Sequence, residues 1–271
     1  MWINTHDKNR LYAQSFGDEQ APVLIFCNSL GTDHTMWQPQ IDALAADYRM
    51  IAYDTRGHGR SSAEGSGWTL ADLGKDVISV LDGFGIESAQ FCGISMGGLT
   101  GLWLAIHRAE RFSRLTVSNT AAKIGNAAAW QVRAEIVRSE GMGSIADSAA
   151  SRWFTPAFCE RRPNTVARLT DTLRHSHAEG YAKCCDVLAT ADADVDPLAH
   201  TRSLQVRAGD ARVERLGLDR DDQAAQQIEQ ARLHRYVQPA GGLIHKHQPR
   251  LRHQIAGDLQ ALLHPAGKGG G

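Results

Sequence analysis

Short apolar runs and stretches of helical spacing alternate along the first 120 residues of the chain. The run at 23–27 is almost continuously apolar, which is typical of a strand buried on both faces of a parallel sheet. Further strands are predicted at 11–15, 50–53, 89–93 and 115–118, and a short helix at 37–44. Strands that alternate with helices indicate an α/β fold with a mostly parallel, doubly wound sheet.

The clearest helical pattern follows Thr69. Apolar residues recur at intervals of three and four positions from Leu70 to Phe84, which is the spacing of one helix face. Thr69 and Asp72 stand in the positions of a capping box, with Asp in place of the usual Glu. We therefore predict a helix that begins directly after Thr69.

The pattern changes after Asn119, where residues 123–188 show helical spacing and no convincing strand. Helices are predicted at 127–140, 144–153, 163–176 and 181–188. We interpret 123–188 as a helical cap inserted into one discontinuous core, formed by 1–122 and 189–264, and 265–271 as a flexible glycine-rich tail. Such caps cover the carboxyl ends of the strands, where ligand sites of α/β sheets lie.

Composition narrows the functional class. The 271 residues suffice for one large α/β domain with an insertion. The net charge of −1 carries no signature of binding to nucleic acid or an acidic membrane, and no apolar run approaches the ~20 residues that span a bilayer. The N-terminus shows no signal-peptide pattern, and the five cysteines lack paired spacing. We expect a cytoplasmic protein with free thiols, without a metal site and without nucleic-acid or membrane partners.

The pattern with the most chemical content is Gly93-Ile94-Ser95-Met96-Gly97, a G-x-S-x-G sequence. Such a pattern also occurs by chance, but here it follows a predicted strand and precedes a helix-like stretch at 97–105. A sharp strand-to-helix turn exposes a serine hydroxyl beside its base, and small flanking residues let the backbone bend. We therefore predict Ser95 as a nucleophile, with the Met96 N–H directed at a developing oxyanion.

Several longer motifs carry a resemblance to a known family. The chain resembles the α/β-hydrolase fold and, within it, the 3-oxoadipate enol-lactonases. The motifs are NSLGT at 28–32, YDTRGHGRS at 53–61, GISMGG at 93–98, SNTAA at 118–122, RWFTP at 152–156 and GYAKCC at 180–185. The last two motifs are the narrower markers, because the serine motif alone is shared by many chemistries.

The resemblance implies a reaction and a set of residues. Ser95 would attack the carbonyl of an enol-lactone and form an acyl-enzyme, giving 3-oxoadipate in aromatic-compound degradation. The N–H groups of Leu30 and Met96 would bind the oxyanion, each such donor contributing ~3 kcal/mol. A histidine and an acid would complete a triad in the order Ser, Asp, His. The substrate is then a small-molecule lactone, and no cofactor or metal is implied.

The last third of the chain departs from the family pattern where the residues that activate Ser95 should stand. In the stretch 203–212, where the family has an apolar strand followed by its acid, Asp210 is the nearest acid in the turn, and Glu214 and Asp219 are further away. Where the family carries His-Leu, this chain has Gly242-Leu243, with His245 and His247 just beyond. We assign Asp210 as the acid and His245 as the base, with His247 or an incomplete triad as the alternatives.

The same third is unusually rich in Arg, Gln and His. Arg207 would lie in a central parallel strand, where an unpaired buried charge costs several kcal/mol. Local changes of reading frame within 203–220 and 234–254 would account for this composition. Sequencing the coding DNA tests the hypothesis, since an uninterrupted frame that encodes Arg207 and Gly242 contradicts it.

Three residues of the predicted cap are candidates for substrate binding. Trp130 and Trp153 would line the pocket, against the simpler interpretation that large aromatic residues only pack in a core. Arg133 follows Trp130 by three positions and so shares its helix face. A dicarboxylate product makes Arg133 a candidate cation for binding, against the alternative of a solvated arginine.

The loop at 54–62 also carries polar residues. His58 precedes Ser95 in the chain, which is the wrong order for the base of this fold, so we favour a structural hydrogen-bonding role. Asp54 and Arg56 are expected to form an ion pair or to brace the loop.

Two other functions fit the Ser95 motif. A carboxylesterase or a cofactor-free haloperoxidase of the same fold would use the same nucleophile. A catalytically impaired member that only binds its ligand would agree with Gly242 at the position of the family histidine. Rates on the enol-lactone against simple esters, and labelling of Ser95, separate these possibilities.

Overall fold

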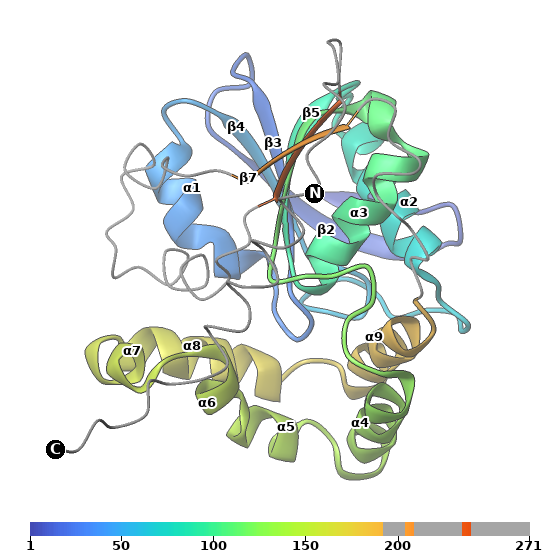
Figure 1. Cartoon of the computed structure of the whole chain (residues 1–271), viewed down its shortest axis with the longest axis vertical. Coiled ribbons are helices and arrows are strands. Elements are labelled where there is room, and N and C mark those ends of the chain that lie inside the picture. Colours follow the sequence, from blue (N-terminus) through green and yellow to red (C-terminus); the bar gives the residue numbers. More distant parts are fainter. Residues whose placement is uncertain (192–203, 209–234, 240–271) are drawn as a thin grey trace, which may run out of the picture. The chain divides into compact units, whose positions relative to one another are not determined.

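The computed structural model describes residues 1–191 and the strands at 204–208 and 235–239. The described strands form one eight-stranded sheet in the order β1-β2-β4-β3-β5-β6-β8-β7 (Figure 1). Their bounds are β1 Trp2–Asn4, β2 Arg10–Phe16, β3 Val23–Cys27, β4 Arg49–Tyr53, β5 Ala89–Ile94, β6 Phe112–Ser118, β7 Leu204–Ala208 and β8 Arg235–Pro239. The central strands β4, β3, β5 and β6 run parallel, which confirms the predicted α/β fold.

The edges of the sheet differ from the prediction. Strand β1 was not predicted, because three residues are too few to show a period. The prediction that Arg207 lies in a central parallel strand is wrong. Strand β7 lies at an edge and pairs antiparallel with β8, and edge strands commonly carry charged residues.

Alternation along the central strands produces two separate cores. Ile25 and Ile51 pack with α2 (Leu70–Gly83) and α3 (Met96–His107), whereas Phe26 and Met50 pack with η1 (His34–Trp37) and α1 (Gln38–Leu44). Successive side chains of a strand point to opposite faces, so α1 covers one face and α2 and α3 the other (Figure 1). The short helix η2 (Ala109–Arg111) leads into β6. This double covering explains why the central strands are almost continuously apolar.

Helix α2 begins at the predicted capping box. The Asp72 N–H donates to Thr69 Oγ1 at 3.3 Å, and the Thr69 N–H donates to Asp72 Oδ2 at 2.9 Å. These bonds satisfy two N–H groups that the helix itself leaves unpaired.

Helices follow β6 up to residue 190, and we call this part the helical segment (Figure 1). Their bounds are α4 Ala127–Glu140, α5 Gly143–Asp147, α6 Ala149–Trp153, α7 Pro156–Arg161, α8 Pro163–Arg174 and α9 Ala178–Thr190. The predicted helix at 144–153 is interrupted, because Ser148 ends α5 and begins α6. Helix α7 was not predicted, although Thr155 caps it and Pro156 occupies its first turn. No described helix combines the length and the hydropathy of a membrane span.

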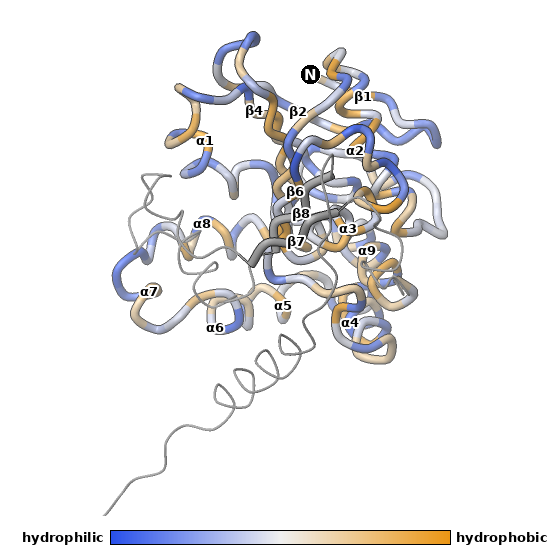
Figure 2. Tube along the Cα trace, turned by 45° about the horizontal axis from the view of Figure 1, so that its top comes forward, coloured by the Kyte–Doolittle hydropathy of each residue, from blue (hydrophilic) through white to orange (hydrophobic). Residues whose placement is uncertain are grey.

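Helix α9 is apolar along most of its length and largely buried (Figure 2). It meets the loop after β4 through two glycines: a Cβ at Gly57 would lie 2.6 Å from Gly180 Cα, and one at Gly180 would lie 2.4 Å from Gly57 O. Further along α9, Lys183 Nζ donates to Ala63 O at 2.7 Å and to Gly65 O at 2.6 Å. Backbone therefore lies directly against backbone where the helical segment joins this loop.

Candidate active site

Ser95 stands on a sharp turn between β5 and α3. Its φ of 54° and ψ of −117° are unfavourable for a residue with a side chain, at a cost of about 1–3 kcal/mol. The Ser95 N–H donates to Ser118 O at 2.9 Å, and the Leu99 N–H donates to Ser95 O at 2.9 Å. The hydrogen-bonded turn places a half-buried hydroxyl at the start of α3, as the motif predicts.

Gly93 and Gly97 give this turn the room it needs. A Cβ at Gly93 would lie 2.4 Å from Gly97 O, and one at Gly97 would lie 2.2 Å from Cys27 O. Both contacts are with backbone atoms, which cannot move aside as a flexible side chain does. The two glycines are therefore required by packing around Ser95.

Two unpaired N–H groups lie on segments that are joined to each other. Met96 begins α3, and its N–H has no acceptor among the residues described, as is usual in the first turn of a helix. The Gly97 N–H donates to Asn28 O at 3.0 Å and ties the nucleophile turn to the loop after β3. The Leu30 N–H, two residues beyond Asn28, also lacks an acceptor in the described part of the chain. Leu30 and Met96 belong to one buried cluster, an arrangement that fits an oxyanion hole.

Asp54 and Arg56 brace the loop after β4, which is one of the two predicted alternatives, and Asp54 Oδ2 accepts from Arg60 N at 2.8 Å. Asp54 and Arg56 do not pair with each other. Arg56 donates to Asp76 through two bonds of 2.6 Å and to Asp7 at 2.7 Å, whereas Asp54 accepts from His34 Nδ1 at 2.7 Å. Although burial opposes it, the carboxylates of Asp76 and Asp7 raise the pKa of Arg56, so its charge persists. Arg56 with Asp76 and Asp7 therefore forms one ion cluster, and His34 with Asp54 forms a separate pair.

His58 has the hydrogen-bonding role that its place in the chain predicts. It is 1% exposed, and its two ring nitrogens contact Gly31 N at 2.9 Å and Arg56 O at 3.1 Å. Both nitrogens are therefore occupied, and His58 is not available as the base for Ser95.

The three predicted substrate-binding residues lie on the helical segment. Trp130 and Arg133 belong to α4 and Trp153 ends α6. The Arg133 guanidinium lies 5.0 Å from the centre of the Trp130 ring, which confirms their shared helix face. Both tryptophans are half-buried and pack against the cluster that contains Leu30 and Met96.

Arg152 and Tyr181 join Arg133 and were not predicted. Burial raises the pKa of the Tyr181 phenol to about 12, while Arg133 and Arg152 oppose that shift. Partial burial lowers the pKa of Arg152, and the charge of Arg133 lowers it further. Arg133 and Arg152 are therefore two positive charges that interact with each other. Within the described residues, neither arginine has a carboxylate partner. The available signal was their position in the motifs RWFTP and GYAKCC.

The predicted acid and base are not placed. Asp210, His245 and the alternative His247 lie outside the described residues, as does the tail at 265–271. Among the side chains that are described, none hydrogen-bonds to Ser95 Oγ.

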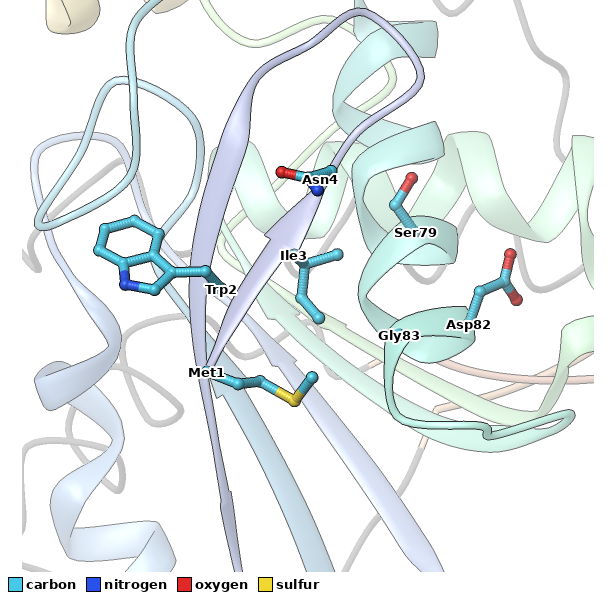
Figure 3. Close-up of a pocket in the computed structure, with 7 residues that line it drawn as sticks. All are labelled: Met1, Trp2, Ile3, Asn4, Ser79, Asp82 and Gly83. Atoms are coloured by element: carbon cyan, nitrogen blue, oxygen red, sulfur yellow. The ribbon is translucent and has the colours of Figure 1, made fainter.

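Elsewhere in the part of the chain that the structure describes, two further groups of polar residues lack the geometry of a catalytic or metal site. A surface hollow of about 340 Å³ lies between β1 and α2, and Ser79 is among the residues that line it (Figure 3). The Ser79 hydroxyl donates to Lys75 O at 3.0 Å, which is a bond within the helix and does not activate it as a nucleophile. His6, Asp7 and Asp72 have the spacing of metal ligands. The Arg56 guanidinium holds Asp7 and opposes a cation there.

Comparison with known proteins agrees with this geometry. A family model described as the alpha/beta hydrolase fold matches residues 22–139. Together with the parallel sheet and the Ser95 turn, this match defines the class: the chain is an α/β hydrolase.

Proteins of similar sequence and structure identify the family within this class. The chain is 53% identical to 3-oxoadipate enol-lactonase 2 of Acinetobacter baylyi, over 69% of this chain and 73% of that protein. It is 47% identical to 3-oxoadipate enol-lactonase 1 of the same organism, over 70% and 71%. The crystal structure of the enol-lactonase from Burkholderia xenovorans LB400 superposes with a TM-score of 0.69 at 41% identity, over 71% and 75%. The chain belongs to the 3-oxoadipate enol-lactonase family.

Proposed function

We propose that this chain hydrolyses 3-oxoadipate enol-lactone to 3-oxoadipate through an acyl-enzyme on Ser95. The observation that carries the proposal is the backbone at Ser95: a positive φ at the start of α3, beside the N–H groups of Met96 and Leu30, which have no acceptor among the residues described. The substrate comes from the relatives, which are named 3-oxoadipate enol-lactonases.

The chemistry runs in two halves. Ser95 Oγ attacks the lactone carbonyl carbon while its proton passes to the base. The carbonyl oxygen takes up the electron pair of the C=O bond and becomes an oxyanion, which accepts hydrogen bonds from the Leu30 and Met96 N–H groups. The ring C–O bond then breaks, and the oxygen departs as an enolate that remains tethered to the acyl chain. The base returns its proton to the enolate, which becomes a ketone.

Water then attacks the acyl carbon and gives a proton to the base, and the bond from that carbon to Ser95 Oγ breaks as Oγ regains the proton, which releases the dicarboxylate. The proposed acid and base are Asp210 and His245, with His247 as the alternative base.

The carboxylate arm of the substrate is proposed to bind the helical segment. Arg133 and Arg152 are two positive charges near each other without a carboxylate partner among the residues described. Their mutual repulsion is relieved when an anion binds between them, and guanidinium groups bind carboxylates with strong charge-assisted bonds. Trp130 and Trp153 would form the apolar walls beside this group.

The proposed domain division assigns 123–188 to a cap over Ser95. It is supported by the contact of Gly57 with Gly180 and by the Tyr181 ring, which would lie 3.1 Å from a Cβ at Gly31. The core would be 1–122 with 189–264. A cytoplasmic location is proposed because all five cysteines are free thiols.

Steady-state rates on the enol-lactone and on p-nitrophenyl acetate test the proposal, with Ser95→Ala as the control. We expect clear preference for the lactone and loss of turnover in Ser95→Ala. A preference for the simple ester would favour the carboxylesterase alternative. Absence of turnover on both, with Ser95 unreactive towards a fluorophosphonate, would favour the catalytically impaired alternative.

The same labelling reaction identifies the base. We expect His245→Ala to slow fluorophosphonate labelling of Ser95 strongly and His247→Ala to leave it nearly unchanged. The reverse order would transfer the role to His247.

A further inference from the structure

Both peptide planes that meet at Leu30 Cα are held by hydrogen bonds. The Ser29 carbonyl accepts from Thr32 N at 3.3 Å and from Thr32 Oγ1 at 2.8 Å. The next peptide is held by its N–H, because Gly31 N donates to His58 Nε2 at 2.9 Å. A trans peptide is planar, so holding the Ser29 carbonyl also sets the direction of the Leu30 N–H, which points the opposite way.

The hydrogen bonds of His58 define its protonation. The Gly31 N–H can only donate, so His58 Nε2 accepts and the proton resides on Nδ1, which donates to Arg56 O at 3.1 Å. Burial lowers the pKa of the ring, against the attraction of Asp54 and Asp33. At neutral pH the ring is therefore neutral, and no proton on Nε2 competes with the Gly31 bond.

The helical segment closes the turn from another side. Gly31 has φ +81°, and a Cβ there would lie 2.4 Å from Leu173 Cδ1 and 3.1 Å from Tyr181 Cε2. The His58 and Tyr181 rings lie 6.3 Å apart, centre to centre. Gly31 is therefore enclosed by α8, α9 and His58, and the Leu30 turn has little room to shift.

We propose that His58 is a positioning residue for the oxyanion hole: its Nε2 fixes the Leu30–Gly31 peptide, which adjoins the peptide that carries the Leu30 N–H, and so keeps this N–H pointing at the carbonyl oxygen of the bound substrate. The inference rests on the proposed role of Leu30 as an oxyanion donor. His58 touches neither the substrate nor Ser95 in this role. Its loss lowers kcat and leaves KM nearly unchanged, because the donor is used most in the transition state.

Two variants of similar polarity separate positioning from general damage. In His58→Gln the side-chain oxygen reaches about as far as Nε2 and can accept from Gly31 N. In His58→Asn the shorter side chain does not reach. The matched control is His175→Asn, which removes an exposed histidine of the helical segment.

The readout is the rate of phosphonylation of Ser95 by a fluorophosphonate, together with hydrogen exchange of the Gly31 amide in the same samples. For His58→Asn we expect a loss of about 10- to 100-fold in rate, below the 10²–10³-fold cost of removing a whole oxyanion donor, and faster exchange at Gly31. His58→Gln should recover most of the phosphonylation rate and most of the protection of the Gly31 amide. His175→Asn should match the unsubstituted chain in both measurements. A rate for His58→Asn within twofold of the unsubstituted chain, or a lost rate with Gly31 still protected, would overturn the inference.

A second measurement needs no variant. The ¹H–¹⁵N spectrum of the unsubstituted chain should show His58 as the Nδ1-protonated tautomer at pH 7, and an Nε2-protonated or charged ring would overturn the inference. Phosphonylation of Ser95 without turnover of the enol-lactone would defeat the proposed function alone, and the variant rates would still decide the role of His58. Failure of the unsubstituted chain to react with the fluorophosphonate would overturn both.

Discussion

Arg56 in the loop after β4 and Arg133 in the helical segment are arginines in contrasting surroundings. Arg56 is fully buried and donates to the carboxylates of Asp76 and Asp7. Arg133 is half-buried, lies over Trp130 and has Arg152 near it, without a carboxylate partner in the described residues. A paired buried cation is neutralised by the fold itself, whereas two unpaired cations repel until an anion binds. The pairing of Arg56 with carboxylates should therefore contribute to the stability of the fold. The unpaired charges of Arg133 and Arg152 should contribute to substrate binding.

The largest effect is expected for Arg56→Met. The substitution leaves the buried Asp76 carboxylate without its partner, which costs about 3–5 kcal/mol in the free energy of unfolding. Urea unfolding measures this loss, with Arg133→Met as the matched control, which should change it by less than ~0.5 kcal/mol. Equal losses of unfolding free energy in the two variants would contradict the separate roles assigned to Arg56 and Arg133.

Arg133→Met should have its effect on catalysis. Loss of a charged hydrogen-bond donor for the carboxylate arm lowers kcat/KM for the enol-lactone by about 10- to 100-fold, mainly through KM. Hydrolysis of p-nitrophenyl acetate, which carries no carboxylate, is expected to stay within twofold. A parallel fall on both substrates would mean that Arg133 supports the site as a whole.

Arg152→Gln is expected to cost less, about tenfold in kcat/KM for the enol-lactone. Arg152 also donates to Ser148 O at 3.2 Å and to Ile145 O at 3.0 Å, so part of its role is structural. The same pair of substrates measures the effect. An unchanged KM for the lactone would remove Arg152 from the proposed anion site.

The smallest effect concerns the His34–Asp54 pair. Although burial opposes it, the Asp54 carboxylate raises the pKa of His34 above its ordinary value. A raised pKa in the folded chain means that the stabilisation is complete below about pH 6.5 and is lost as the pH rises through the folded value. Unfolding of His34→Gln should therefore differ more from the unsubstituted chain at pH 6 than at pH 9, by less than ~1 kcal/mol. An equal difference in unfolding free energy at both pH values would contradict a charged interaction between His34 and Asp54.

Sequence patterns predicted the parts of the fold that local physics determines. Strand β3 matches its prediction at both ends, because a strand covered on both faces is apolar throughout. Thr69 and Asp72 marked the start of α2, because a capping box is local. The break at Ser148 carries no such signal, since its residues are compatible with one continuous helix.

Contacts between residues that are far apart along the chain could not be predicted from local sequence patterns. Proximity along the chain suggested that Arg56 pairs with Asp54, but its partners come from Asp7 and Asp76, 49 and 20 positions away. Arg152 joined Arg133 only through the packing of α4 and α6 with α9. Ser95 was predictable because its turn is encoded within five residues, whereas the proposed anion site depends on three helices.

Mass spectrometry of the chain, acid-quenched during turnover of the enol-lactone, tests the central claim most directly. Ring opening expels no fragment, so the peptide that contains Ser95 should gain the full mass of the lactone, and Ser95→Ala should show neither the gain nor turnover. Turnover without an adduct on this peptide, retained in Ser95→Ala, would contradict nucleophilic catalysis by Ser95.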